Sequence, residues 1–132
     1  MTKTKAQKDL ILAEGLVSKV VEDFPTRLKV QSIYKGLTKS FPIRVRTNGL
    51  CQAVAFSEAK KNSGSNPDRK EAHRLLLAHV GAILGVGANP LSAIRIATTT
   101  DYMLQTRSIL SAWVYFKRFA DSIIEADEDE GE

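Results

Sequence analysis

The chain has 132 residues, a formal net charge of +4, one cysteine and no stretch of about 18 apolar residues, the length that a membrane-spanning helix needs. One cysteine excludes an internal disulfide, and the N-terminus MTKTKAQKDL is charged but lacks the apolar run of a signal peptide. These features predict a cytoplasmic protein of one domain, with its own hydrophobic core and without a membrane partner.

The charges are distributed unevenly along the chain. Six of the 15 acidic residues lie in the last eight positions, EADEDEGE, which leaves 9 acidic against 19 basic side chains in residues 1–124, a balance of +10. A basic body suits a polyanion, because each cation that neutralises a phosphate releases condensed counterions. A solvated surface without a partner is the alternative. We expect one helical domain at residues 1–124 and a disordered acidic tail at 125–132.

Helical periodicity runs through most of the chain, whereas the alternation of a strand is nearly absent. The predicted fold is therefore all-α, a compact bundle of about five to six helices without a sheet. In the first helix apolar residues recur every three or four positions from Leu10 to Phe24, and Pro25 ends it. A second helix is expected to begin with Thr26 as its cap and to end near KSFP, before Pro42.

The third predicted helix contains Asn48-Gly49, a dipeptide that often forms a hairpin turn. The sequence after it, LCQAVAFSEAKK, does not alternate as a strand would. We therefore predict one continuous helix from Ser40, its N-cap, to about Asn62, with Pro42 in its first turn and Gly49 costing about 1 kcal/mol relative to alanine. The register that supports this helix is formed by Val45, Gly49, Ala53 and Phe56.

Three further helices are expected in the second half of the chain. Asn66-Pro67 is a typical cap and first turn, and the helix after it runs to about Leu84, where GVGAN breaks it. Asn89-Pro90 begins a short helix through Ala97. The longest and most aromatic helix begins near Thr100.

The histidines and the cysteine do not form the pattern of a catalytic or metal site. His73 and His79 are six residues apart, whereas a two-histidine metal face needs a spacing of four. Cys51 lies in an apolar stretch and is predicted to be a small core residue. We expect no enzymatic activity, no cofactor and no metal, so the predicted role is binding.

Two clusters of polar residues are candidates for binding. Arg44, Asn48 and Gln52 are four residues apart and form a polar stripe, whose arginine and amide groups suit phosphates and ribose hydroxyls. The second cluster is YFKRFA at 115–120, which mixes two cations with aromatic side chains. A solvated face and a set of core aromatics are the alternative readings. The candidate residues are Arg44, Arg46, Asn48, Gln52, Lys60, Lys61, Lys117 and Arg118.

The sequence resembles the small subunit of the Cmr complex, the type III-B CRISPR effector that uses a guide RNA to recognise target RNA. The resemblance rests on TNGLCQAVAF at 47–56 followed by lysines, on Tyr102 at the start of the last helix, and on WVYFKRFAD at 113–121, about half of the chain. It implies a non-catalytic helical bundle that stacks in several copies beside the backbone subunits of the complex. It also implies contacts to the phosphates and sugars of guide and target RNA, and a role in antiviral defence.

The alternative is a free-standing basic helical module that binds DNA or a protein partner by itself. Such a module would explain the charge, but the sequence lacks helix-turn-helix spacing. The small subunit of the related type III-A complex shares the implied task, and the motif at 47–56 favours Cmr.

Overall fold

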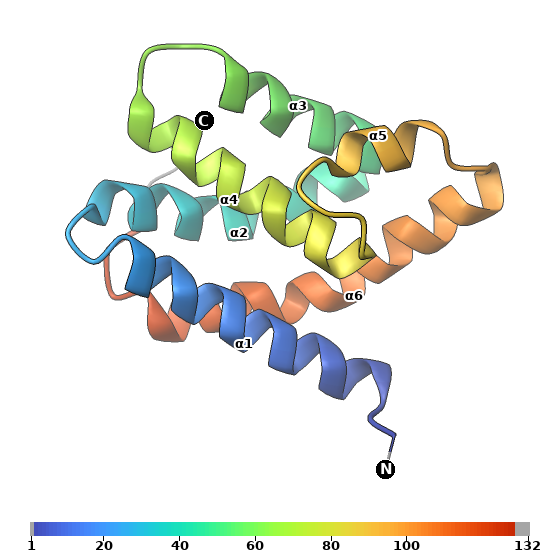
Figure 1. The fold of residues 1–132 in the computed structure, drawn as a ribbon, viewed down its shortest axis with the longest axis horizontal. Helices are drawn as coiled ribbons and strands as arrows, with labels where there is room; N and C mark the ends of the chain where they lie inside the picture. Colours follow the sequence, from blue (N-terminus) through green and yellow to red (C-terminus); the bar gives the residue numbers. More distant parts are fainter. Residues whose placement is uncertain (1, 129–132) are drawn as a thin grey trace.

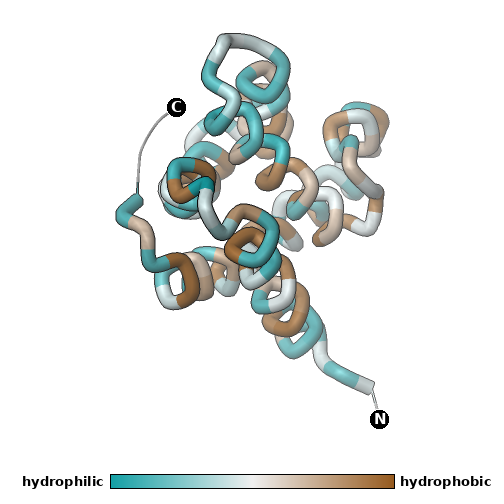
Figure 2. The backbone as a smooth tube through the Cα atoms, turned by 60° about the vertical axis from the view of Figure 1, so that its left-hand side comes forward, coloured by the Kyte–Doolittle hydropathy of each residue, from teal (hydrophilic) through white to brown (hydrophobic). Residues whose placement is uncertain are grey.

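The computed structural model describes residues 2–128, which form six α-helices and no strand, so the predicted all-α class is confirmed. The middle of the bundle is formed by α2 and α4, with α1 and α6 on one side and α3 and α5 on the other (Figure 1). Hydrophobic and hydrophilic residues alternate along the helices (Figure 2), so each helix turns an apolar face to a shared core. The helices are α1 Lys5–Asp23, α2 Leu28–Asn48, α3 Leu50–Asn62, α4 Pro67–Leu84, α5 Pro90–Arg95 and α6 Thr99–Ile123.

Side chains close in sequence cap three of the helix starts. At α1, the Thr4 hydroxyl accepts a hydrogen bond from the Gln7 N–H, and the Gln7 side chain accepts one from the Thr4 N–H. At α4, the Asn66 side chain accepts from two backbone N–H groups, as predicted for Asn66-Pro67. At α6, the cap is Thr98. Such local signals are readable from sequence because donor and acceptor lie within one turn.

Three predicted helix limits need small corrections. The N-cap of α2 is Arg27 and not Thr26, and it has no side-chain capping bond. The short helix α5 ends at Arg95, two residues before the predicted Ala97. α6 begins at Thr99, one residue before the predicted position.

The prediction of a helix end before Pro42 and a new start at Ser40 is wrong, because α2 runs through both residues. A proline inside a helix has no N–H, so the carbonyl four residues earlier loses its partner. Here that carbonyl belongs to Thr38, and it accepts a hydrogen bond of 2.9 Å from the indole N–H of Trp113 on α6. The partner lies 75 residues away in sequence, so local sequence could not reveal that the helix continues.

The prediction of one continuous helix through Gly49 is also wrong, because this residue separates α2 from α3. Gly49 has φ 90° and ψ 158°, a combination that is essentially limited to glycine. The chain makes no hairpin either: the Gly49 N–H still bonds to the Val45 carbonyl at 2.9 Å, and the Ala53 N–H bonds to the Gly49 carbonyl at 3.1 Å. One glycine thus changes the direction of the chain between two helices.

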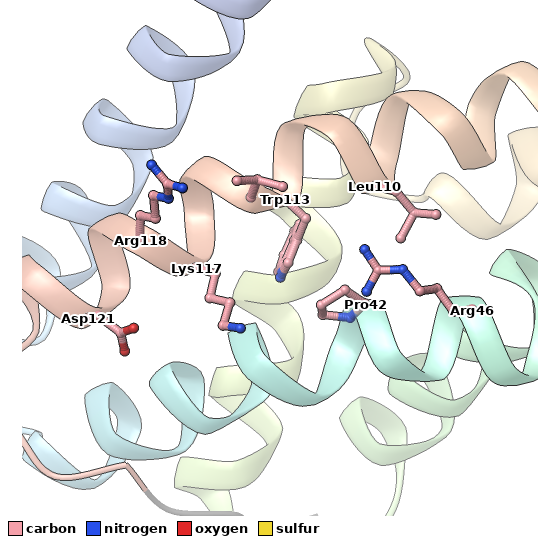
Figure 3. A pocket seen from close by; sticks show the side chains of 8 residues that line it. Pro42, Arg46, Leu110, Trp113, Lys117, Arg118 and Asp121 are labelled. Atoms are coloured by element: carbon pink, nitrogen blue, oxygen red, sulfur yellow. The ribbon is translucent and has the colours of Figure 1, made fainter.

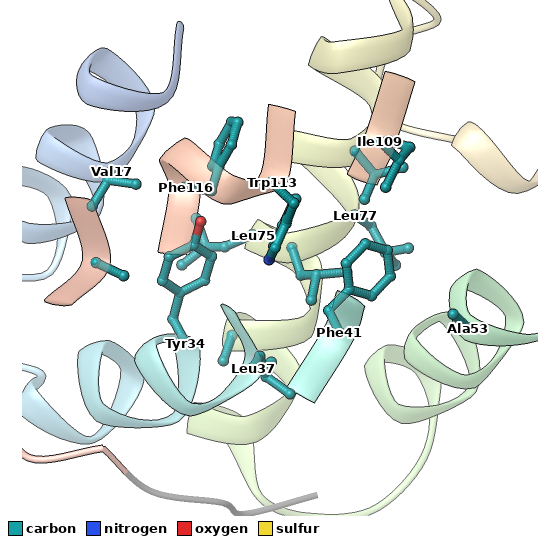
Figure 4. Packing of buried hydrophobic residues seen from close by; sticks show 14 of the residues in the cluster. Val17, Tyr34, Leu37, Phe41, Ala53, Leu75, Leu77, Ile109, Trp113 and Phe116 are labelled. Carbon is teal, nitrogen blue, oxygen red and sulfur yellow. The ribbon is translucent and has the colours of Figure 1, made fainter. Parts of the chain in front are cut away.

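A chain of ring contacts crosses the core and joins α2, α4 and α6. Figure 4 shows the rings of Tyr34, Phe41, Trp113 and Phe116. Ring centroids are 4.8 Å apart for Phe41 and Trp113, 4.9 Å for the stacked Trp113 and Phe116, 5.6 Å for Phe116 and His79, and 5.2 Å for His79 and Tyr34. The tyrosine hydroxyl and His79 Nδ1 share a hydrogen bond of 2.6 Å. The last helix is therefore a core element, and its aromatic side chains explain much of its burial.

Residues 124–128, which include the described part of the acidic segment, lie along α2. Lys35 Nζ donates to the carbonyl oxygens of Ile124 at 2.9 Å and Ala126 at 3.2 Å, and the Ser32 hydroxyl donates to the Asp127 carbonyl. The predicted disorder of 125–132 falls in part on residues 129–132, which lie outside the described residues, and it stays a prediction. None of the helices at residues 2–128 combines the length and the hydropathy that a membrane-spanning segment needs.

Candidate nucleic-acid interface

The predicted polar stripe lines one hollow although the helix that was expected to carry it is broken. Arg44 and Asn48 stand on the last turns of α2, and Gln52 stands on the first turn of α3. Together with Ala53, Ala55 and Phe56 they line a hollow of about 340 Å³, which we call the α2–α3 hollow. The three polar side chains therefore stay together although Gly49 separates the two helices.

Phe56 holds two cations beside this hollow. The guanidinium carbon of Arg44 lies 3.9 Å from the centre of the Phe56 ring, and Lys60 Nζ lies 5.4 Å from it. Both distances fall within the range of a cation–π interaction. Lys61, the other predicted lysine of α3, is 3.0 Å from Glu58, which compensates its charge. Phe56 was predicted only as part of an apolar face, so its role under the cations was missed.

The hydroxyl of Tyr102 caps α3 from a distant helix. Gly49 occupies the N-cap position of α3 and has no side chain to offer, and the Tyr102 hydroxyl oxygen accepts a hydrogen bond of 3.0 Å from the Cys51 N–H. The same hydroxyl would lie 3.3 Å from a Cβ atom placed on Gly49. Cys51 itself is exposed, so the prediction that it is a core residue is wrong. At the first turn of α3, its backbone is held by Tyr102 while its side chain faces solvent.

A second hollow lies between α2 and α6 (Figure 3) and brings together cations from two separate sequence motifs. Arg46 from α2 and Lys117 and Arg118 from α6 line it, with a volume of about 260 Å³. We call it the α2–α6 hollow; its other lining residues are Pro42, Leu110, Trp113, Val114 and Asp121.

Six of the eight candidate residues line the two hollows, three in each, and the hollows lie on different sides of α2. Arg44 and Arg46 are two residues apart, which places them about 200° apart around the helix axis. Arg44 accordingly lines the α2–α3 hollow, and Arg46 lines the α2–α6 hollow. The two arginines of α2 thus line two separate hollows on either side of this helix.

Lys39 extends the cationic side of the α2–α6 hollow and was missed by sequence reasoning. Its Nζ is 3.5 Å from a carboxylate oxygen of Asp121 and forms a second, shorter ion pair with Glu128. The hydrogen bond that Lys39 donates to the Glu128 carboxylate, together with the negative charge of Asp121, raises the pKa of Lys39. Lys39 lies seven residues before Arg46, two turns along the same side of α2, and this spacing could have identified it.

Both histidines are buried, and each makes a hydrogen bond in the core through its Nδ1 atom. His73 Nδ1 lies 3.1 Å from the Ser57 hydroxyl, and His79 Nδ1 bonds to Tyr34. Burial, with a smaller contribution from the positive charge of Arg74, lowers the pKa of His79 to about 4. Among residues 2–128, histidine, cysteine and carboxylate side chains form no group of three that could hold a metal ion.

The comparison with known proteins identifies the family. A family model described as CRISPR-associated protein (Cas_Cmr5) matches residues 10–123. The chain belongs to the Cmr5 family. A relative from Thermus thermophilus, named CRISPR system Cmr subunit Cmr5, is 34% identical over 94 residues, which are 70% of this chain and 75% of the relative. The resemblance predicted from the motifs is therefore confirmed.

The fold is also that of a Cmr5 family protein. The crystal structure of a CRISPR-associated Cmr5 family protein from Thermus thermophilus matches with a TM-score of 0.74 and 29% identity, over 93% of this chain and 100% of that one. Every residue that lines the two hollows lies within the part that matches the Cmr5 family, residues 10–123, whereas the acidic residues 125–132 lie beyond it.

Proposed function

We propose that this Cmr5 family chain is a non-catalytic, RNA-binding structural subunit of the cytoplasmic type III-B CRISPR (Cmr) complex. Its partners are the guide and target RNA, the backbone subunits of the complex and other copies of itself, and its role is to support antiviral defence. The name of the Thermus relative, a subunit of the Cmr system, supports this assignment.

The α2–α6 hollow is the observation that carries the RNA-binding proposal. Arg46, Lys117 and Arg118 line it from two helices, together with apolar side chains that include Trp113. Arginine side chains bind phosphates through paired N–H groups, and contacts to phosphates and sugars position a strand without reading its sequence. A subunit that must accept any guide needs contacts of this kind.

The α2–α3 hollow supports the same proposal from the other side of α2. There Arg44 is fixed on the Phe56 ring, and the amides of Asn48 and Gln52 can meet hydroxyl and phosphate groups. Phe56 limits the freedom of the guanidinium, so less conformational entropy is lost when it binds a phosphate. Two cationic sites separated by one helix suit a backbone that passes along α2.

Stacking into a filament requires two different complementary surfaces, because only a heterologous contact that does not close can repeat. An exposed apolar surface at the end of the bundle formed by α5 and the start of α6 is a candidate for one of them. Ile96 is 83% exposed there, and Met103 and Leu104 are also exposed. Large apolar side chains that are exposed close to one another often mark a contact with another protein.

RNA binding by three full-length double variants tests the proposal. Arg46→Glu with Lys117→Glu changes the α2–α6 hollow, and Arg44→Glu with Lys61→Glu changes the side of α3. Lys3→Glu with Lys8→Glu, two exposed residues at the N-terminus, is the matched control with the same change in net charge. Circular dichroism checks that each variant is folded.

Affinity for a single-stranded RNA is measured by fluorescence anisotropy over a range of salt concentrations. We expect both hollow variants to bind about tenfold or more weakly at low salt and to reduce the slope of log K against log salt by about 1 or more. The control is expected to change affinity by about twofold or less. Equal losses in all three variants, or unchanged affinity at low salt, would contradict the assignment of RNA contacts to the hollows.

A further inference from the structure

The described start of the acidic C-terminal segment, residues 125–128, lies against α2 together with Ile124 before it. Ile124 is fully buried and Ala126 packs against the core. Lys35 donates hydrogen bonds to the carbonyl oxygens of both, at 2.9 and 3.2 Å, and so also places a positive charge at the C-terminal end of α6, where the helix dipole favours it. The first acidic residues of the segment therefore have a defined place on the protein.

That place is beside the α2–α6 hollow. Glu128 forms an ion pair with Lys39, and among the described residues Asp121, which lines the hollow with Arg46 and Lys117, also reaches this amine. Lys39 is therefore shared between Glu128 and Asp121, and Figure 3 shows Asp121 beside Lys117 and Arg118. A phosphate that enters the hollow from this side meets an amine that already has an anionic partner.

We propose that the acidic C-terminal segment competes with RNA for Lys39 and for the cationic α2–α6 hollow beside it. This inference rests on the proposed function, since it assumes that RNA enters that hollow. Residues 125–132 carry six carboxylates, and they lie beyond the part of the chain that matches the family. The competition is thus a feature of this chain that the family match does not include.

The ion pair between Lys39 and Glu128 is exposed to solvent, so RNA can displace Glu128 from Lys39. The side chains of Lys39 and Glu128 are 38% and 41% exposed, and solvent-exposed ion pairs are weak and screened by salt. An RNA backbone offers many phosphates at fixed spacing, so it can replace Glu128 on Lys39 while Ile124 and Lys35 keep the segment attached. A short or isolated polyanion gains less binding free energy from repeated contacts, so the acidic segment excludes it from the α2–α6 hollow more effectively.

The test compares two full-length variants that change the net charge by the same amount. The tail variant is Glu125→Gln, Asp127→Asn and Glu128→Gln. The matched control is Glu14→Gln, Glu22→Gln and Asp23→Asn, which removes three exposed carboxylates from α1. We expect the tail variant to bind a single-stranded RNA about fivefold or more tightly than the wild type at low salt, and the control to gain about twofold or less.

A third variant, Lys39→Gln, identifies the amine for which the segment competes. In this background we expect the tail substitutions to lose most of their effect on RNA affinity, because the two changes act on one ion pair. An equal gain in the tail variant and the α1 control, no gain in the tail variant, or an undiminished gain in the Lys39→Gln background would each overturn the competition while RNA binding itself persists. If the wild type and all variants fail to bind RNA even at low salt, the proposed RNA contact falls first.

Discussion

The indole N–H of Trp113 donates a hydrogen bond of 2.9 Å to the carbonyl oxygen of Thr38, the backbone group that Pro42 leaves without a helical partner. This bond joins the middle of α6 to α2 at the position where the helical ladder of α2 is interrupted. Trp113 and Pro42 also line the α2–α6 hollow. The contact that completes the ladder therefore also fixes the two helices that carry the cations of that hollow.

A double-mutant cycle tests this relationship. Trp113→Phe should lower the free energy of unfolding by about 1–3 kcal/mol, because the buried Thr38 carbonyl loses its donor. In a Pro42→Ala background, the new N–H at position 42 can bond to the same carbonyl, so Trp113→Phe should cost about 1 kcal/mol less. Urea unfolding of the four proteins measures the coupling. Additive effects within about 0.3 kcal/mol would show that the two residues do not share this carbonyl.

The conformation of Gly49 predicts opposite effects for two glycine substitutions. Gly49→Ala should cost about 1–3 kcal/mol, because alanine rarely adopts φ 90° with ψ 158° and its Cβ would press on the Tyr102 hydroxyl. Gly15→Ala is the control, since Gly15 lies within α1 with no atom within 4 Å of an added Cβ, and it should gain about 0.5–1 kcal/mol. Thermal or urea unfolding measures both. A Gly49→Ala variant as stable as wild type would contradict the assigned backbone conformation.

Removal of the Tyr102 hydroxyl should loosen the start of α3. Tyr102→Phe is expected to cost about 1 kcal/mol, the usual effect of losing a cap, because the Cys51 N–H loses its acceptor. Hydrogen exchange at the first turn of α3 should become faster in this variant. Tyr115→Phe, on the same helix but away from any helix start, serves as the control. Equal exchange at Cys51 in wild type and Tyr102→Phe would mean that the hydroxyl does not cap the helix.

Burial of His79 predicts that the protein loses stability in mild acid. Its pKa is about 4 in the folded chain and about 6.5 when unfolded, so the unfolded state binds the additional proton between these values. Stability should be independent of this group above about pH 6.5 and fall as the pH drops towards 4, by up to about 3 kcal/mol. An NMR titration of the His79 ring measures the pKa directly. A midpoint near 6.5 would contradict the burial argument.

The parts of the fold that could be predicted depend on residues close in sequence. The start of α4 was predicted because Asn66 and Pro67 act within one turn. The course of α2 could not be predicted, because the donor that replaces the missing N–H of Pro42 comes from Trp113. The break at Gly49 is stabilised from Tyr102, which is also distant in sequence.

In the candidate site too, the features that depend on contacts between distant residues could not be predicted. The cations of both hollows were identified from residue type and spacing, which sequence supplies directly. The opposite directions of Arg44 and Arg46 follow from their spacing, but the helix that each of them faces could not be identified, because it depends on how α3 and α6 pack against α2. The ion pair between Lys39 and Glu128 depends on the return of the chain to α2, which periodicity does not describe.

The central claim, that this chain works as an RNA-contacting subunit of the Cmr complex, is tested most directly by purification of the tagged full-length chain from its host. Bound proteins are identified by mass spectrometry and bound RNA by sequencing. We expect Cmr backbone subunits and short guide RNAs to be recovered together with the chain. Recovery of partners that include no CRISPR subunit and no guide RNA would contradict the account and favour a free-standing binding module.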